Sequence, residues 1–375
     1  MAKRKKSRKI TLPVVILSVL AVCVISLYYF NVPPLDFDLG IGWKFTVRTP
    51  DEGPDPDIAY TDGELHVDFI DVGQGDSILI RFPDGKNMLI DGGDKNKDAY
   101  SAVAEVLTEY DVTTLDYVML THTDADHCGS LDDVIASDVT AKTVYMPYVR
   151  SRSAIDPITT GSVDIPDLLR ECYDLSQTTY GYIGTAALED FVLATVGDGA
   201  DIKYSLQGEV ISGEGYTMTF YTPEASQYAL VRTGNSHDIN NVSPIVILEF
   251  NGVKIMFTGD VSYESGSSKG HERGAEGVFL DYVRKTGADV DVDVLKVAHH
   301  GSRGSSCRDF LNTVLPEYAI ISVGEGNSYG HPHQETLNRL AEIHADVYTT
   351  MDRGNIMLTV NSEGEISFEF EKGAL

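Results

Sequence analysis

The sequence predicts one α/β domain that follows an apolar N-terminal segment. Short apolar runs of strand length alternate with helical stretches, and several of these runs end in clusters of His and Asp. The charge also changes along the chain, because the first 30 residues are basic while the whole protein carries a formal charge of −28. About 310 residues remain after the N-terminal part, and they can fill a single core.

The N-terminal 30 residues predict a membrane anchor. Residues 1–9 hold six basic and no acidic side chains, and residues 10–30 hold no charged side chain. About 20 apolar residues span a bilayer core, and a basic flank stays in the cytoplasm. We therefore expect a single-pass cell-membrane protein with a cytoplasmic N-terminus. A cleaved signal peptide is the alternative, but the segment before Pro33 lacks a small-x-small cleavage site.

Residues 31–62 predict a spacer between the membrane and the folded domain at 63–375. The run at 49–57 is acidic and rich in proline, which favours an extended chain. Residues 31–375 hold 23 basic and 57 acidic side chains, a formal charge of −34. Such a surface repels polyanions unless bound metal ions compensate locally. Nucleic acid is therefore a disfavoured partner, and no protein partner is evident.

The densest set of candidate metal ligands follows a predicted buried strand at 115–120. His122, Asp124, Asp126 and His127 lie within six residues. In an extended loop the first three side chains leave from one side and His127 points elsewhere, which suits two neighbouring divalent ions that share a water. Imidazole with carboxylate favours zinc, with manganese or iron as alternatives. The alternative is a polar, Asp-rich turn that binds no metal.

The second half of the domain offers further candidate ligands. Asn251-Gly252 between two apolar runs predicts a hairpin, and Asp260 follows its second strand. A strand expected at 291–298 ends in His299 and His300, whose side chains would face opposite ways. We expect His300 to bind metal and His299 to act as an acid or a phosphate contact, with the order left open. His237 is either a ligand or an exposed loop residue.

These motifs resemble the metallo-β-lactamase superfamily. The run from His122 to His127 resembles its His-x-His-x-Asp-His signature, with Asp124 where many members have the second His. Four other motifs resemble the ComEC-like group, the hydrolase domain of ComEC/Rec2 competence proteins: Asp-Val-Gly-Gln-Gly-Asp at 71–76, Thr-Gly-Asp at 258–260, His-His-Gly-Ser at 299–302, and Ser-Val-Gly-x-x-Asn-x-Tyr-Gly-His-Pro at 322–332.

The resemblance implies a four-layer αββα sandwich with two divalent metal ions at one edge, and it makes Asp260 the bridging ligand. We expect the Asp91 carboxylate to contact the ring nitrogen of a ligating His that does not bind the metal, and so to fix the orientation of that ring. The implied site consists of metal ligands His122, Asp124, Asp126, His127, Asp260 and His300, catalytic residues His299, His331 and Asp126, and substrate-binding residues Asn241, Ser302 and Asn327.

The expected activity is hydrolysis of a phosphodiester, small or polymeric, by a hydroxide bound at a dinuclear centre. The enzyme would be held at the membrane with its catalytic domain outside the cytoplasm. Two alternatives remain: a nuclease role in DNA processing or uptake, and an inactive domain that serves as a surface-binding module. The ComEC-like motifs disfavour β-lactam hydrolysis.

Overall fold

The computed structural model describes residues 36–38, 44–46, 63–147, 186–230, 236–263 and 274–373. The chain divides into two units, Met1–Ala59 and Tyr60–Leu375. In the first unit, β1 (Asp36–Asp38) pairs with β2 (Lys44–Thr46) in antiparallel fashion. The predicted anchor at 10–30 lies outside the described residues. Among the helices that are described, none has the length and apolar character needed to cross a membrane.

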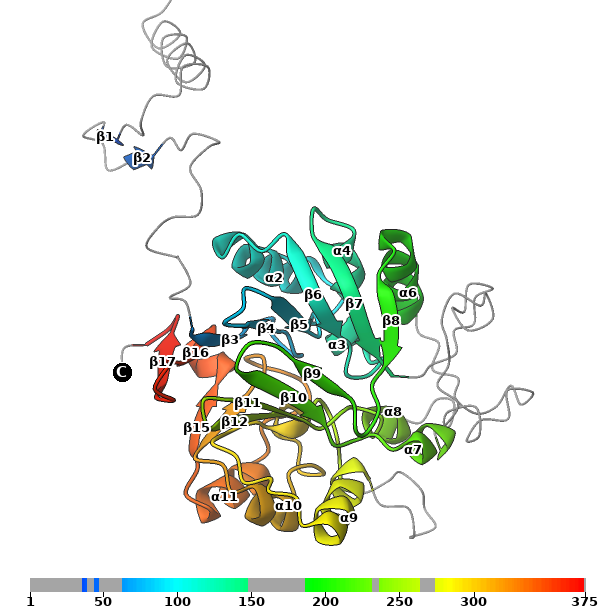
Figure 1. Ribbon diagram of the computed structural model, residues 1–375. Helices are drawn as coiled ribbons and strands as arrows, with labels where there is room; N and C mark the ends of the chain where they lie inside the picture. The colour runs from blue at the N-terminus through cyan, green and yellow to red at the C-terminus, as the bar shows by residue number, and fades with distance from the viewer. Residues whose placement is uncertain are drawn as a thin grey trace, which may run out of the picture. The chain divides into compact units, whose positions relative to one another are not determined.

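Two mixed sheets form the centre of the second unit (Figure 1). The first has the strand order β17 (Ile366–Phe370), β16 (Ile356–Val360), β3 (Leu65–Phe69), β4 (Ile78–Arg81), β5 (Asn87–Ile90), β6 (Thr114–Met119), β7 (Thr140–Met146), β8 (Asp201–Tyr204). The second has the order β15 (Asp346–Thr349), β14 (Tyr318–Ile321), β13 (Val294–Lys296), β12 (Val253–Phe257), β11 (Val246–Phe250), β10 (Tyr216–Phe220), β9 (Val210–Ser212).

Helices cover the outer face of each sheet (Figure 1). The first sheet carries α2 (Lys97–Glu109), α3 (Ala125–Cys128), α4 (Leu131–Ile135) and α6 (Ala186–Asp198). The second carries α9 (Ala275–Thr286), α10 (Arg308–Val314) and α11 (Gln334–Glu342). Shorter elements connect these parts: α7 (Ala225–Leu230), α8 (Ser236–Asn240), η1 (Ala298–Gly301) and α12 (Thr350–Arg353).

Three apolar layers hold the elements together. One lies between the two sheets, and the other two lie between each sheet and its helices. In the middle layer, Phe69 of the first sheet and Phe257 of the second are stacked with ring centroids 6.5 Å apart, and both are buried. This is the αββα sandwich that the resemblance to the metallo-β-lactamase superfamily implied.

The local structure explains where several elements begin and end. Asn251 and Gly252 have φ angles of 49° and 84°, which permit the tight turn between β11 and β12. Helix α2 begins at Lys97, because the Asn96 side chain accepts hydrogen bonds from the amides of Asp98 and Ala99.

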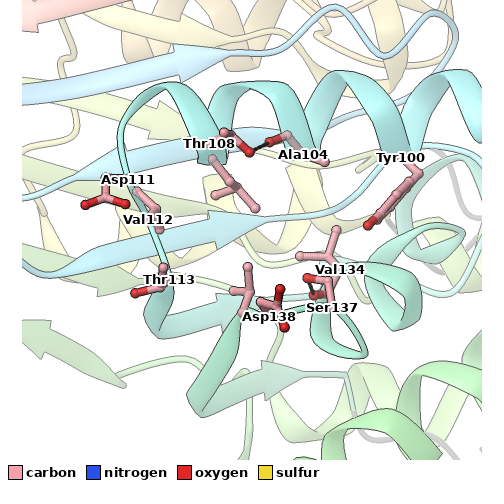
Figure 2. Close-up of a pocket in the computed structure, with 11 residues that line it drawn as sticks. Tyr100, Ala104, Thr108, Asp111, Val112, Thr113, Val134, Ser137 and Asp138 are labelled. Atoms are coloured by element: carbon pink, nitrogen blue, oxygen red, sulfur yellow. Dashed lines mark hydrogen bonds between the residues drawn. The ribbon is translucent and has the colours of Figure 1, made fainter. Parts of the chain in front are cut away.

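A pocket of about 260 Å³ opens in the outer helical layer, between α2 and the segment after α4 (Figure 2). None of the predicted site residues lines it. Its walls are formed by Tyr100, Ala104, Leu107, Thr108, Asp111, Val112, Thr113, Val134, Ser137, Asp138 and Val139.

The stacked phenylalanines between the sheets give a prediction for stability. Phe69 is 0% exposed, so Phe69→Ala should lower the free energy of unfolding by about 3–5 kcal/mol through lost burial and the cavity left behind. Urea denaturation measures the change. Leu193→Ala, at a side chain that is 43% exposed on α6, is the control and should change it by less than about 0.5 kcal/mol. Equal effects would contradict the packing described here.

Candidate metal centre

Loops at the ends of three strands bring the candidate ligands together. His122 follows β6, and the short helix α3 that comes next carries Asp126 and His127. Asp260 follows β12, and His300 lies in η1 after β13. Because β12 and β13 pair in parallel, the loops that follow them leave from the same edge of the second sheet.

His299 and His300 separate in a way that the sequence did not predict. We expected a strand that continues to both residues, but β13 ends at Lys296 and both histidines adopt left-handed backbone conformations, with φ angles of 51° and 52°. The turn, not strand alternation, directs the two side chains differently. His300 is buried, whereas the His299 side chain is 27% exposed.

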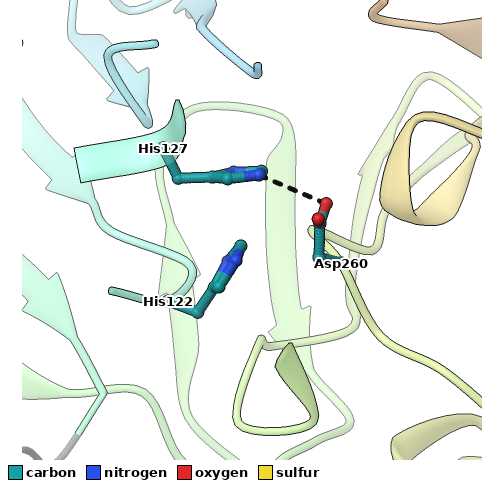
Figure 3. A group of neighbouring side chains, drawn as sticks. All are labelled: His122, His127 and Asp260. Atoms are coloured by element: carbon teal, nitrogen blue, oxygen red, sulfur yellow. Dashed lines mark ion pairs between the residues drawn. The ribbon is translucent and has the colours of Figure 1, made fainter. Parts of the chain in front are cut away.

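Asp260 lies between two groups of ligand atoms. In the first group, His122, His127 and Asp260 offer atoms that all lie within 4.8 Å of one another, and His127 Nε2 is 3.3 Å from Asp260 Oδ1 (Figure 3). Asp126, His127 and His300 form the second group. His300 Nε2 lies 3.5 Å from Asp260 Oδ2 and 3.4 Å from Asp126 Oδ2. The two oxygens of Asp260 therefore face different groups.

The ligand atoms fit a divalent metal. The Nε2 atoms of His122, His127 and His300 and the Oδ1 atom of Asp260 are buried without a hydrogen-bond partner. Each such atom would cost about 1–3 kcal/mol if nothing bound it. A metal ion would use these lone pairs, and a mixed set of imidazole and carboxylate ligands suits zinc and related ions.

The outer nitrogen of each of these imidazoles is held in place. His127 Nδ1 lies 2.8 Å from Asp91 Oδ2, and His300 Nδ1 lies 2.9 Å from the Ser322 carbonyl oxygen. His122 Nδ1 lies 3.1 Å from Thr121 Oγ1. With the proton on Nδ1, the lone pair of Nε2 is directed into the centre. Asp91 thus makes the contact with a candidate ligand that the sequence predicted.

The carboxylates create a strong attraction for positive charge. Burial lowers the pKa of His300, but Asp260 and Asp76 outweigh it and raise that pKa to about 10. Burial also lowers the pKa of His127, but Asp260 and Asp91 raise it well above its ordinary value. Protons therefore occupy the ring nitrogens of His127 and His300 when no cation is bound, and metal binding would release them. Burial and the neighbouring His127 lower the pKa of His122 to about 3, so that imidazole is already neutral at pH 7.

His299 and His331 lie beside this centre. Their ring centroids are 5.4 Å apart, and His299 Nε2 is 3.6 Å from Asp260 Oδ2. His331 is 8% exposed, and its Nδ1 atom has no hydrogen-bond partner. Burial and the neighbouring His299 lower the pKa of His331 to about 4, so this imidazole is neutral at pH 7. Tyr329, 65% exposed, stacks on the ring of His331.

The three residues expected to bind substrate are engaged within the protein. Asn327 accepts a hydrogen bond from the His331 amide and donates to the His331 carbonyl, so it positions the His331 loop. Asn241 accepts from the amides of Ser262 and Ala275 and donates to His237 O and Ser262 Oγ. The carbonyl of Ser302 accepts from Thr336 Oγ1, and its Oγ atom accepts from the Gly304 amide. These contacts occupy the polar groups that Asn241 would offer to a substrate.

Asp124 and His237 are not members of either ligand group. The Asp124 side chain is 34% exposed, and its Oδ2 atom lies 3.8 Å from His122 Nε2. His237 is exposed on α8. Within the described part of the chain, neither belongs to a group of three side chains whose ligand atoms lie within 4.8 Å.

Sequence reasoning missed one residue at the centre. Lys296 is buried, and its Nζ atom lies 2.7 Å from Asp76 Oδ2. The only signal was a lysine inside the apolar run at 294–298, directly before the paired histidines. The other oxygen of Asp76, Oδ1, lies 3.3 Å from His300 Nδ1.

Comparisons with known proteins agree with the motifs. A family model described as the metallo-beta-lactamase superfamily matches residues 70–164. ComE operon protein 3 of Bacillus subtilis is 27% identical over 308 residues, which cover 78% of this chain and 33% of that protein. Recombination protein 2 of Haemophilus influenzae is 25% identical over 292 residues, which cover 77% of this chain and 28% of that protein.

The chain therefore spans about a third or less of the length of these two relatives. Among solved structures, the metallo-beta-lactamase fold protein YhfI from Bacillus subtilis is 9% identical, with a TM-score of 0.41, and the match covers 78% of this chain and 98% of that one. The ligand signature, the sandwich that carries it and the family model lead to one conclusion: the chain contains a metallo-β-lactamase domain, and it is similar to competence proteins of the ComEC-like group.

Proposed function

We propose that this protein hydrolyses phosphodiester bonds at a centre with two divalent metal ions. Metal-dependent hydrolysis is supported by the metallo-β-lactamase domain and by the ligand cluster. The observation that carries the proposal is the position of Asp260, whose two oxygens face two groups of buried imidazoles. Zinc is the metal we expect, since the ligands are nitrogen and oxygen atoms of His and Asp.

The two histidines beside the centre, His299 and His331, suit an anionic substrate. The His331 Nδ1 atom, buried without a partner, is available for a hydrogen bond to a phosphoryl group or to the water that attacks it. Asn327 holds the loop that carries this imidazole. His299 Nε2 faces Asp260, so it can contact a group bound at the centre. A neutral imidazole can donate one hydrogen bond to the charge that develops on a phosphoryl oxygen.

The metal ligands would divide into two sets. His122, His127 and Asp260 would hold one ion. Asp126 and His300 would hold the other together with Asp260, whose Oδ2 atom lies 3.5 Å from His300 Nε2, and His127 lies close to both sets. When bound, two ions would supply positive charge for the substrate and lower the pKa of a water that attacks it. Asp91 and the Ser322 carbonyl would keep the imidazoles oriented while this happens.

A nucleic-acid strand is a second candidate substrate. The name of one relative, Recombination protein 2, refers to recombination. The formal charge of −34 over residues 31–375 opposes the binding of a long polyanion away from the metal ions. A small phosphodiester or a short strand end is therefore favoured over an extended duplex.

The first test is metal content together with turnover. The fragment that begins at Ile58 should contain about two metal ions per chain by elemental analysis, as expected for a two-metal hydrolase. It should also hydrolyse bis-para-nitrophenyl phosphate, and a chelator should abolish this activity. A protein with neither metal nor turnover would instead support the surface-binding module.

Two variants sharpen this test. Asp260→Ala removes the carboxylate shared by both ligand groups, so both metal content and turnover should fall. His237→Gln changes an exposed histidine on α8 and should keep both. Full activity in Asp260→Ala would contradict the bridging role, and metal loss in His237→Gln would make that residue a ligand.

His331→Gln should separate catalysis from metal binding. Loss of a donor to the developing charge lowers kcat by about 10²–10³-fold, while metal content stays at the wild-type value. Steady-state kinetics with bis-para-nitrophenyl phosphate measure the effect. His344→Gln, at an exposed histidine outside the centre, is the matched control. An unchanged kcat in His331→Gln would rule out the proposed contact.

We further propose that residues 10–30 anchor the enzyme in the cell membrane, with the catalytic domain outside the cytoplasm. The support is the uncharged run and its basic flank. The full chain should remain in the membrane pellet after an alkaline carbonate wash, whereas the fragment from Ile58 should stay in solution. A mature protein whose mass lacks the first 30 residues would show a cleaved signal peptide instead.

A further inference from the structure

A buried ion pair joins the two sheets beside the metal centre. Lys296 belongs to β13 of the second sheet, and Asp76 lies in the loop between β3 and β4 of the first. Their side chains are 1% and 2% exposed, and Nζ lies 2.7 Å from Oδ2. Nζ also donates to the Val297 carbonyl oxygen at 3.1 Å. Desolvation makes a buried pair expensive unless its geometry is good, so the location of this pair requires an explanation.

Asp76 is itself close enough to join the metal ligands. With Asp260 and His300 it forms a group whose ligand atoms lie within 4.8 Å, and with Asp91 and His127 it forms another. Two of the four candidate metal groups in the described part of the chain therefore contain Asp76. The Lys296 ammonium occupies one of its oxygens. A fixed positive charge at that position opposes the approach of a metal ion.

The charges of the centre balance when Lys296 is counted. Five carboxylates and one ammonium lie in or beside the two ligand groups, a formal charge of −4 that two divalent cations neutralise. Without the lysine, one negative charge would remain unbalanced in a buried site. The groups counted are the carboxylates of Asp76, Asp91, Asp124, Asp126 and Asp260 and the ammonium of Lys296.

The loop that carries Asp76 is tightly packed against neighbouring backbone, so the loop itself is fixed in place. The ion pair with Lys296 then determines where the Asp76 carboxylate points. A Cβ atom added to Gly75 would overlap the Asp126 carbonyl oxygen, and one added to Gly324 would overlap the Gln74 amide. The Asp76 amide donates to the Asp126 carbonyl at 3.2 Å. Its free oxygen, Oδ1, lies 3.3 Å from His300 Nδ1. The carboxylate is thus fixed between a cation and a candidate ligand.

We propose that Lys296 is a positioning residue that holds Asp76 outside the metal shell and directs its carboxylate to His300. In this way the pair sets the affinity of the metal position that Asp126 and His300 complete. The lysine acts as a built-in cation where the acidic cluster could otherwise accept a further metal ion. The inference rests on the proposed metal centre, but not on the identity of the substrate.

The experiment compares two buried ion pairs in the same domain. Asp76→Asn combined with Lys296→Met removes both charges of the ion pair beside the metal centre and approximately preserves side-chain volume. The matched control combines Asp68→Asn with Arg81→Met. That pair is 3.2 Å apart and 6% and 4% exposed, and neither residue belongs to a candidate metal group in the described part of the chain. Zinc dissociation constants come from competition with a chromophoric chelator, and circular dichroism reports folding.

In the first double variant we expect the weaker zinc site to lose about 10–100-fold in affinity, as for other residues that orient metal ligands. The zinc affinity of the other site should change by less than about threefold. The affinities of both sites in the control variant should also change by less than about threefold. Wild-type affinity at both sites in a folded Asp76→Asn/Lys296→Met protein would overturn the inference. An equal loss in the control would overturn it too, because the effect would then be general.

A second variant provides a test if the Asp76→Asn/Lys296→Met protein does not fold. Lys296→Gln keeps a hydrogen-bond donor and removes only the charge that opposes a metal ion, so it should let the acidic cluster bind more zinc ions per chain than the wild-type protein. An unchanged number of zinc ions at unchanged affinity would overturn the inference. The outcomes also separate this inference from the proposed function. If the wild-type protein binds no metal, the proposed function fails. If it binds two ions and the variants bind them equally well, only the role of Lys296 fails.

Discussion

The centre depends on one constraint: ligands from both halves of the sandwich must meet at one edge with their lone pairs directed inward. His122, Asp126 and His127 belong to loops of the first sheet, whereas Asp260 and His300 belong to loops of the second. The apolar layer between the sheets fixes how far apart these loops lie. Tightly packed side chains cannot shift by a fraction of an ångström without a cost in free energy. The packing of the core and the positions of the metal ligands therefore depend on each other.

Several parts of this structure follow from local sequence. The hairpin at Asn251-Gly252 and the strand before His122 depend on periodicity and turn residues, which act over a few positions. The candidate ligands were recognisable because His and Asp are dense at the ends of predicted strands. The four-layer arrangement came from the resemblance, since periodicity alone does not fix how two sheets pack.

Other features depend on contacts between distant residues and were not predictable in this way. Lys296 and Asp76 are 220 positions apart, and nothing near either residue identifies its partner. The left-handed conformations of His299 and His300 oppose the usual preference of residues other than glycine, so a strand was the natural expectation. Asn241 and Asn327 look like substrate contacts in the sequence, yet their amides stabilise loops.

The division of the ligands between two halves has a consequence for assembly of the domain. A segment that ends before Asp260 contains His122 and His127 but lacks the shared carboxylate, so it cannot form either complete ligand group. Metal binding is then linked to docking of the two halves, and free metal stabilises the docked state by mass action. At a metal concentration 100 times the dissociation constant, this linkage amounts to about 2.7 kcal/mol per site. The supply of metal would then help to decide how much of the protein reaches its folded form.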